Sequence, residues 1–443
     1  MNSIISHKSS NLSGEMIVPG DKSISHRSLI IGSAVTGKII VNNLLESEDV
    51  LATANALRKM GVSINKLSNN KWEIFGSGIG SLSGTNNILD MGNSGTGARL
   101  LMGLVAGSDV EATFIGDQSL SKRPMKRIIS PLIETGATIE NFNNDTLPIK
   151  IKGSKITLPI EYESTVASAQ VKSSILLAGL SSIGTTSIIE PSLSRDHTER
   201  MLKYFGAKIE TIKLKNSKWK ITLDGIPTLK PLDINVPSDP SSASFPIVSA
   251  LITPNSKVKV MNVCVNDLRT GLFKTLIEMG ANIKFTNSRE INGELISDIS
   301  AETSKLNGIT VPKLRAASMI DEYPILAIAA VKAEGDTIME GIEELRYKET
   351  DRIKAVCEGL QKVGVKTIET HNSMVVKGLG PQGQINQNIE INSNLDHRIA
   401  MSFLCLGLIS EKPIKVNDTD TIKSSFPFFL NKMKKIGAKF EQL

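Results

Sequence analysis

The chain has little of several features that mark common classes of protein. Of its 443 residues only 4% are aromatic, three are cysteine and five are histidine. The cysteines, Cys264, Cys357 and Cys405, stand far apart among apolar neighbours and show no CxxC spacing, which predicts buried thiols in a reducing compartment. The histidines form no HxxxH or HExxH pair, so we expect no metal site.

Long apolar runs are absent as well. The longest, such as ILAIAAV, are far shorter than the roughly 20 residues that span a bilayer, and the polar start MNSIISHKSS contains no secretory apolar core. We therefore expect a soluble, cytoplasmic protein. Its 40% of apolar residues can fill the cores of two large domains or about three smaller ones.

The charge favours an anionic partner without identifying it. The formal net charge is +6 and the isoelectric point is near 9.0, although surface lysines alone can produce this balance. We find no stretch that interleaves basic and aromatic side chains, as single-stranded nucleic-acid platforms generally do. Small anionic ligands are favoured over nucleic acid.

Six segments repeat one pattern along the chain. Each ends an amphipathic helical pattern at a glycine and continues into a short β-branched run, which predicts a helix with a left-handed C-terminal residue followed by a strand. The glycines lie 70 to 84 residues apart. This period is too long for a solenoid and predicts a small α/β subdomain present six times. The glycines are Gly61, Gly136, Gly206, Gly280, Gly364 and Gly437.

A second, more apolar helical segment occurs in each repeat, followed by a turn and a strand. Because these segments are apolar nearly all round, we expect buried helices. A polar cluster precedes each one: DKSISHR, GNSGTGAR, SAQVKSS, SDPSSAS, IDEYP and LDHR. Helix N-termini carry unpaired N–H groups and attract anions. Ordinary N-capping is the alternative explanation, but lysine and arginine at a helix start oppose the dipole unless an anion lies between them.

Charged residues also precede the other helix of several repeats, in SKRPMKR, SRDHTER and YKETDR. For each of these cations taken alone, the alternative interpretation is a solvated charge on the protein surface. GNSGTG matches neither GxxxxGK[ST] nor GxGxxG, so it predicts no ATP or dinucleotide site. Asp321 and Glu349 are candidate proton-transfer groups, although Asp321 and its neighbour could simply cap a helix. Seven cations stand at predicted helix starts: Lys22, Arg27, Arg123, Arg195, Lys348, Arg352 and Arg398.

Together these motifs resemble the 5-enolpyruvylshikimate-3-phosphate synthase family, particularly its class II bacterial branch. PGDKSISHR, GNSGTGAR, KRPM, SAQVKS, RDHTER, IDEYP, KETDR and LDHRIAM occur in family order from end to end. The resemblance implies an α/β fold of two similar domains, each made of three βαβαββ repeats with buried parallel helices. It implies domains at 21–237, on the shikimate-3-phosphate side, and at 1–20 plus 238–443, with the active site in the interdomain cleft.

The family reaction transfers the enolpyruvyl group of phosphoenolpyruvate to the 5-hydroxyl of shikimate-3-phosphate. The resemblance implies Asp321 as the base on that hydroxyl and Glu349 as the proton carrier for the methylene carbon, with Lys22 as its competitor. The implied contacts of shikimate-3-phosphate are Lys22, Ser23, Arg27, Ser168, Ala169, Gln170, Ser194, Arg195, Asp321 and Lys348. Those of phosphoenolpyruvate are Lys22, Gly95, Arg123, Gln170, Arg352 and Arg398.

The resemblance further implies a monomer without cofactor or metal, inhibited by glyphosate, because Gly95 leaves open the space that alanine fills in some tolerant class II enzymes. Many family members carry lysine where this chain has Ser424, and here Lys423 stands one residue earlier. Two rivals differ in function. UDP-N-acetylglucosamine enolpyruvyl transferases generally carry a reactive cysteine in the loop matching 120–127, which has none here. A non-catalytic polyanion binder would leave Asp321 and Glu349 unexplained.

Overall fold

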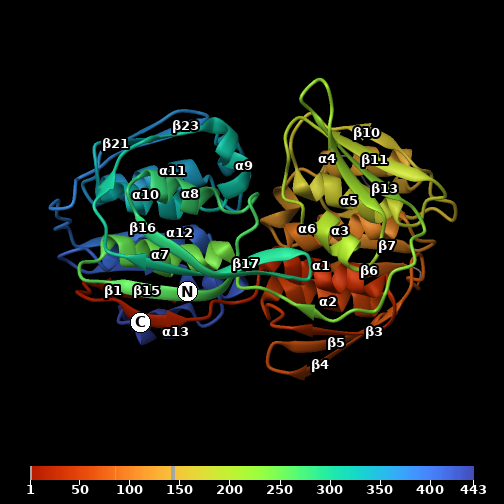
Figure 1. Cartoon of the computed structure of the whole chain (residues 1–443), viewed down its shortest axis with the longest axis horizontal. Coiled ribbons are helices and arrows are strands. Elements are labelled where there is room, and N and C mark those ends of the chain that lie inside the picture. Colours follow the sequence, from red (N-terminus) through yellow and green to blue (C-terminus); the bar gives the residue numbers. More distant parts are fainter. Residues whose placement is uncertain (1, 85, 141–144) are drawn as a thin grey trace. The chain divides into compact units, whose positions relative to one another are not determined.

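The chain forms two compact units in the computed structural model, which describes residues 2–84, 86–140 and 145–443 (Figure 1). Unit 1 comprises Met1–Pro19, Pro237–Glu290 and Leu295–Leu443, and unit 2 comprises Gly20–Val236 and Ile291–Glu294.

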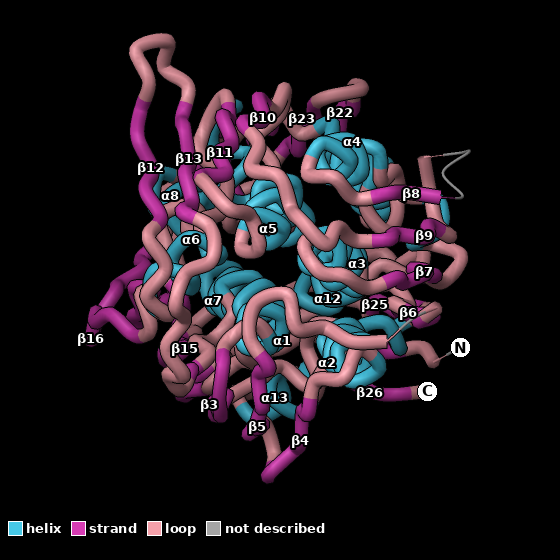
Figure 2. Tube along the Cα trace, turned by 90° about the vertical axis from the view of Figure 1, so that its right-hand side faces the viewer, coloured by secondary structure: helices cyan, strands magenta, loops and turns pink. Residues whose placement is uncertain are grey.

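Three apolar helices form the centre of each unit. Figure 2 shows those of unit 2 surrounded by strands. All 13 residues of α7 and all nine of α10 are buried, and full burial of one leucine or isoleucine side chain contributes about 1.5–3 kcal/mol. This confirms the buried helices predicted from the sequence. The central helices are α1 (Lys22–Ser33), α3 (Gly95–Ala106) and α5 (Ala169–Gly179) in unit 2, and α7 (Pro240–Ile252), α10 (Tyr323–Val331) and α12 (His397–Gly407) in unit 1.

A second, amphipathic helix accompanies each central helix and ends just before one of the six repeated glycines. All six glycines have φ between +86° and +107°, a backbone conformation that a Cβ atom disfavours. The predicted left-handed helix ends are therefore confirmed. The six helices are α2 (Glu48–Lys59), α4 (Lys126–Glu134), α6 (His197–Tyr204), α8 (Gly271–Glu278), α11 (Arg352–Lys362) and α13 (Phe429–Lys435).

Unit 2 contains three four-stranded sheets with one common topology. In each, the first two strands pair in parallel and the remaining pairs are antiparallel. The sheets run β14 (Ile234–Asn235), β3 (Thr36–Asn42), β5 (Lys71–Ser77), β4 (Ser63–Ser68); β6 (Asn87–Asp90), β7 (Glu111–Ile115), β9 (Ile149–Lys152), β8 (Thr138–Glu140); and β10 (Glu161–Glu163), β11 (Thr185–Glu190), β13 (Trp219–Asp224), β12 (Ile209–Lys213).

Unit 1 repeats this topology in three further sheets. They run β2 (Ser13–Met16), β15 (Lys257–Cys264), β17 (Glu294–Glu302), β16 (Asn282–Ile291); β19 (Thr310–Val311), β21 (Asp336–Glu340), β23 (Ser373–Lys377), β22 (Thr367–Glu369); and β24 (Ile389–Asn392), β25 (Ile414–Asn417), β1 (Ile4–His7), β26 (Lys439–Gln442). A short parallel pair, β18 (Leu306–Asn307) and β20 (Ala333–Glu334), is added. Short helices complete the chain: η1 (Leu120–Lys122), η2 (Lys313–Arg315), α9 (Ala316–Met319), η3 (Glu343–Tyr347) and η4 (Thr419–Ser424).

Two strands are exchanged where the chain passes from one unit to the other. β2 precedes α1 in the chain but pairs with β15 in unit 1, whereas β14 precedes α7 and pairs with β3 in unit 2. β1, from the start of the chain, pairs antiparallel with β26 from its end, where the other repeats pair two strands that follow one another in the chain. With these exchanges, all six repeats have the βαβαββ pattern, which confirms the predicted fold class.

Close approach of α3 and α5 defines the centre of unit 2. A Cβ atom built at Gly103 of α3 would lie 2.2 Å from the backbone oxygen of Ser174 in α5, and one at Gly107 would lie 2.8 Å from that of Ala178. Glycine is therefore required for these helices to touch along their backbones. No helix in the described part of the chain is long and apolar enough to cross a membrane.

Gly103→Ala is expected to lower the free energy of unfolding by about 3 kcal/mol, because the backbone of α5 must move away. The matched control is Gly206→Ala, whose Cβ would have no neighbour closer than 3.6 Å and should cost about 1 kcal/mol through its positive φ. Urea unfolding measures both. Equal losses would contradict the packing explanation.

Candidate active site

The polar clusters predicted at helix starts do lie there, and side chains of each cluster begin the central helices. Asp21, Ser94 and Ser168 cap α1, α3 and α5, and each side chain accepts a hydrogen bond from a backbone N–H of the first turn. Asp239 and Asp396 do the same for α7 and α12. N-capping is thus part of the role of five of the six clusters, whereas Glu322 at the start of α10 makes no side-chain capping bond. Capping also leaves the cations unexplained.

The first turns of the three central helices of unit 2 are joined by side chains. Gln170 Nε2 of α5 donates to Thr96 Oγ1 of α3 at 3.0 Å, and Arg99 Nη1 donates to Gln170 Oε1 at 2.7 Å. Arg27 Nη2 of α1 donates to Ser173 Oγ of α5 at 2.8 Å. The N-termini of α1, α3 and α5 therefore lie together and present their N–H groups to one region.

Arg27 lies one turn into α1 and is buried. Its Nε donates to Thr198 Oγ1 at 2.7 Å, and its Nη1 donates to the backbone oxygen of Ser23 at 3.0 Å. Burial lowers the pKa of Arg27 to about 10, so the guanidinium stays charged at neutral pH. Lys22, at the start of α1, forms an ion pair with Asp49 at the start of α2.

Gly95 begins α3 beside Arg123. A Cβ at Gly95 would lie 3.2 Å from Arg123 Nη1. Arg123 Nη2 donates to Asn93 Oδ1 at 2.5 Å and to Ser119 Oγ at 3.2 Å. The glycine thus leaves room for the guanidinium next to the helix N-terminus.

A fully buried lysine underlies the start of α5. Lys172 Nζ lies 2.7 Å from Glu199 Oε1 and 3.2 Å from Glu190 Oε2, and it donates to the backbone oxygen of Ser194 at 3.1 Å. Burial lowers the pKa of Lys172, but the two carboxylates outweigh this effect and raise it above its ordinary value. The sequence motifs do not mark these three charged residues as a group, although a lysine within an otherwise apolar helix is a visible signal.

In unit 1 a buried arginine lies among three carboxylates. Arg352, the first residue of α11, is 1% exposed. Its Nε donates to Asp396 Oδ2 at 2.8 Å, its Nη2 to Glu349 Oε2 at 2.6 Å and its Nη1 to Asp321 Oδ1 at 3.3 Å. Burial alone lowers the pKa of Arg352, yet the carboxylates outweigh it and raise the pKa above its ordinary value.

The remaining predicted residues of unit 1 surround the same aspartate. Lys348 Nζ lies 3.7 Å from Asp321 Oδ1. Arg398 Nη1 donates to the backbone oxygen of Asp321 at 3.1 Å and lies 3.7 Å from Glu322 Oε1. The Asp321 carboxylate therefore lies beside two cations, Lys348 and Arg352, while Arg398 binds the backbone oxygen of the same residue. Glu322 also accepts a hydrogen bond from Ser241 at the start of α7, so the starts of α7, α10 and α12 lie together as well.

All seven predicted cations are buried or half-buried, which contradicts the alternative that they are merely solvated surface charges. The structure brings them together in two clusters, one in each unit. The unit 2 cluster contains Lys22, Ser23, Arg27, Gly95, Arg123, Ser168, Ala169, Gln170, Ser194 and Arg195, and the unit 1 cluster contains Asp321, Lys348, Glu349, Arg352 and Arg398. By contrast, the Lys423 side chain is 71% exposed and lies 3.8 Å from Asp420, while Ser424 Oγ lies 3.4 Å from His397 Nδ1.

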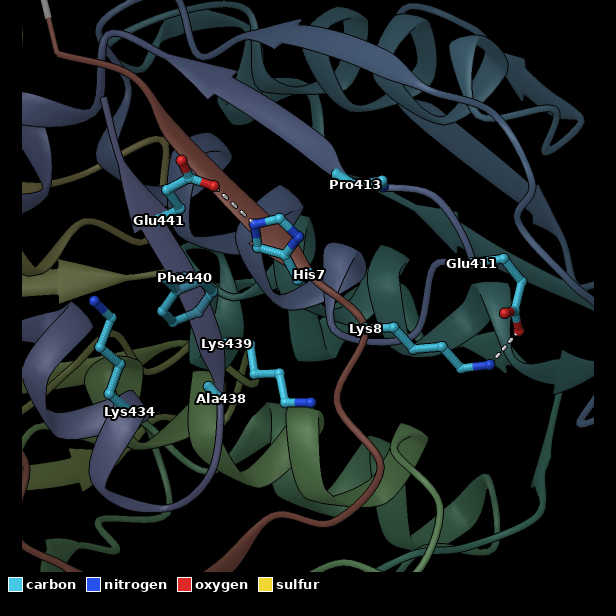
Figure 3. Close-up of a pocket in the computed structure, with 9 residues that line it drawn as sticks. All are labelled: His7, Lys8, Glu411, Pro413, Lys434, Ala438, Lys439, Phe440 and Glu441. Atoms are coloured by element: carbon cyan, nitrogen blue, oxygen red, sulfur yellow. Dashed lines mark hydrogen bonds and ion pairs between the residues drawn. The ribbon is translucent and has the colours of Figure 1, made fainter.

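A surface cavity of about 660 Å³ in unit 1 lies elsewhere (Figure 3). Its lining includes His7 of β1 and Phe440 of β26, and it contains no predicted site residue. Lys8 pairs there with Glu411, and His7 Nε2 lies 3.3 Å from Glu441 Oε2. Its lining comes from β1, β26, α13 and the loop at Glu411 and Pro413, not from the start of a central helix, so the two clusters remain the better candidates.

A family model described as EPSP synthase (3-phosphoshikimate 1-carboxyvinyltransferase) matches residues 6–433. The chain belongs to this family. A 3-phosphoshikimate 1-carboxyvinyltransferase of Parvibaculum lavamentivorans is 51% identical over 99% of this chain and 97% of the relative. One of Bartonella tribocorum is 50% identical over 98% of each chain.

Solved structures give the same result for the fold. An EPSP synthase from Acinetobacter baumannii covers 100% of both chains with a TM-score of 0.88 and 41% identity. The enolpyruvyl transferase NikO from Streptomyces tendae has a TM-score of 0.79 at 15% identity, covering 100% of this chain and 98% of its own. This second likeness concerns the fold alone. The family and the fold class expected from the motifs are thus confirmed.

Asp396→Ala is expected to lower the free energy of unfolding by about 3–5 kcal/mol, because it removes the buried partner of Arg352 as well as the cap of α12. Asp351→Ala is the matched control: this aspartate caps α11 and pairs with Arg346, but it is only half-buried. It should cost about 1 kcal/mol. Denaturant unfolding compares the two, and a loss at Asp396 no larger than that at Asp351 would contradict the buried-charge account.

Proposed function

We propose that the chain transfers the enolpyruvyl group of phosphoenolpyruvate to the 5-hydroxyl of shikimate-3-phosphate and releases phosphate. In the shikimate pathway this step leads to chorismate and the aromatic amino acids. The observation that carries the proposal is the gathering of cations and carboxylates at the starts of buried helices in a chain of this family. Two substrates, each with a carboxylate and a phosphate, bring roughly five or six negative charges, which seven cations can offset.

Unit 2 holds the phosphate of shikimate-3-phosphate in this proposal. Ser168, Ala169 and Gln170 form the first turn of α5, where N–H groups and the helix dipole favour an anion. Arg195, next to Ser194, adds a guanidinium. Three residues of α1 contribute the remaining contacts in this unit: Lys22, Ser23 and Arg27.

For phosphoenolpyruvate, we propose contacts with arginines and helix starts. Arg123, Arg352 and Arg398 offer planar guanidinium groups, which suit the paired oxygens of carboxylate and phosphate. The other contacts are Lys22, Gly95 and Gln170.

The carboxylates of unit 1, Asp321 and Glu349, are the proposed proton-transfer groups. Asp321 accepts the proton of the 5-hydroxyl while the hydroxyl oxygen attacks C2 of phosphoenolpyruvate, and Lys348 holds the neighbouring hydroxyl groups. Glu349, or alternatively Lys22, delivers a proton to the methylene carbon, which gives a tetrahedral phosphate ketal. Removal of a proton from the new methyl group and departure of phosphate then form the enolpyruvyl ether. The intermediate forms no covalent bond to the protein.

The rival acceptor UDP-N-acetylglucosamine is not favoured. Its enzymes rely on a reactive cysteine, whereas burial raises the pKa of Cys357 to about 11 and that of Cys405 to about 12. Thiols with such pKa values stay protonated at neutral pH and are poor nucleophiles. All three cysteines are buried.

We also propose that the enzyme acts as a monomer in the cytoplasm.

Phosphate release from phosphoenolpyruvate should depend strictly on shikimate-3-phosphate, and Asp321→Ala should lower kcat by about 10²–10⁴-fold through loss of the general base. The control is Asp267→Ala, an exposed aspartate of the same unit that pairs with Lys274, which should leave kcat unchanged. Release with UDP-N-acetylglucosamine, or with neither acceptor, would contradict the proposal.

Glyphosate should inhibit competitively with phosphoenolpyruvate, since Gly95 leaves open space beside Arg123. Gly95→Ala should raise the inhibition constant about tenfold or more, because its Cβ would lie 3.2 Å from the guanidinium and a tenfold change needs only 1.4 kcal/mol. Steady-state inhibition at several phosphoenolpyruvate concentrations measures it. An unchanged constant in the variant, or no inhibition of the wild type at micromolar glyphosate, would refute this expectation.

A further inference from the structure

We infer that Glu190 is a positioning residue for recognition of the shikimate-3-phosphate phosphate, acting through the Ser168 and Ser194 segments. The inference rests on the proposed function. Glu190 is the last residue of β11 and is fully buried. It contacts two segments that are 26 residues apart in the chain, and both contain residues assigned to the phosphate.

The contacts of Glu190 fix both segments. The backbone N–H of Ser168, the cap of α5, donates to Glu190 Oε1 at 3.1 Å. The Ser194 hydroxyl lies 2.7 Å and 2.9 Å from the two carboxylate oxygens, and the backbone N–H of Ser194 donates at 3.4 Å. One carboxylate therefore sets the distance between the N-terminus of α5 and the segment that carries Arg195.

These contacts also assign different roles to the two serines. A hydroxyl has one proton to donate, and that of Ser194 is directed at Glu190. Ser194 thus contributes mainly by tying its segment to Glu190. The Ser168 hydroxyl accepts from the backbone N–H of Val171, and its own proton remains available for a phosphate oxygen.

A buried carboxylate beside an anion site needs a cation to offset it. Lys172 supplies this charge and also binds Glu199, while Thr198, the neighbour of Glu199, accepts from Arg27. Lys172 thus joins Glu190 and Glu199 in one buried network. The lysine offsets the charge of Glu190, which holds both serine segments.

Glu190→Gln should weaken binding of shikimate-3-phosphate about tenfold, measured by calorimetry as the Kd. The Kd for shikimate, which lacks the phosphate, should change less than twofold, and the KM for phosphoenolpyruvate should change little. A role in folding alone would not alter the ratio of the two Kd values. Unfolding curves of each variant establish that it is folded under assay conditions.

The matched control is Glu46→Gln. Glu46 likewise binds a lysine, a side-chain N–H and a backbone N–H in unit 2, from Lys66, Trp72 and Asn70, away from the site residues. It should leave both Kd values unchanged. A double-mutant cycle adds Ser194→Ala. If Glu190 acts through Ser194, Ser194→Ala should weaken binding of shikimate-3-phosphate much less in the Glu190→Gln background than in the wild type.

The outcomes separate the two claims. A wild type that binds no shikimate-3-phosphate and releases no phosphate refutes the proposed function. If the wild type is active but Glu190→Gln weakens binding of both ligands equally, or of neither, the ratio of the two Kd values is unchanged. That result overturns the positioning role of Glu190. If Glu190→Gln does not fold, Glu190→Asp tests the same role. It keeps the charge beside Lys172 but draws the carboxylate away from Ser194. We expect it to weaken binding of shikimate-3-phosphate, but not of shikimate, as in Glu190→Gln.

Discussion

Burial of the central helices from their first turn is the constraint on which the rest of the structure depends. A helix start exposes N–H groups without intrahelical partners, and burying such groups unpaired is costly. Here five of the six central helices meet that need with a capping aspartate or serine. The remaining N–H groups and the positive end of each helix dipole are suited to binding an anion.

Each unit pairs its buried cations with carboxylates of the same unit. In unit 2, Lys172 and Arg27 stand against Glu190 and Glu199, while in unit 1 Arg352 stands among Asp321, Glu349 and Asp396. A buried cation that loses its partner is strongly destabilising. The carboxylates therefore hold the cations charged and in place, and in unit 1 some of the same carboxylates carry the proposed proton transfers.

The sequence predicted what depends on local pattern. The repeated glycines end their helices in the left-handed conformation because that requirement is encoded within a few residues, and the polar clusters mark helix starts for the same reason. The network around Lys172 escaped prediction because its members come from α5, β11 and α6, and only the fold brings them together. Strand β14 has two residues, too few to show any periodicity.

The site residues have a different status. Their gathering into clusters follows from the structure, whereas their individual roles rest on the family motifs. Gly95 illustrates the difference: the structure shows the space beside Arg123, and the GNSGTGAR motif assigns that space to phosphoenolpyruvate.

A crystal structure with shikimate-3-phosphate and phosphoenolpyruvate bound tests the central claim most directly. The account predicts the shikimate phosphate at the first turn of α5, contacting Ser168, Ala169 and Gln170, and the 5-hydroxyl within hydrogen-bond distance of Asp321. Ligand phosphates bound away from the central helix starts, for example in the cavity lined by His7 and Lys439, would contradict it.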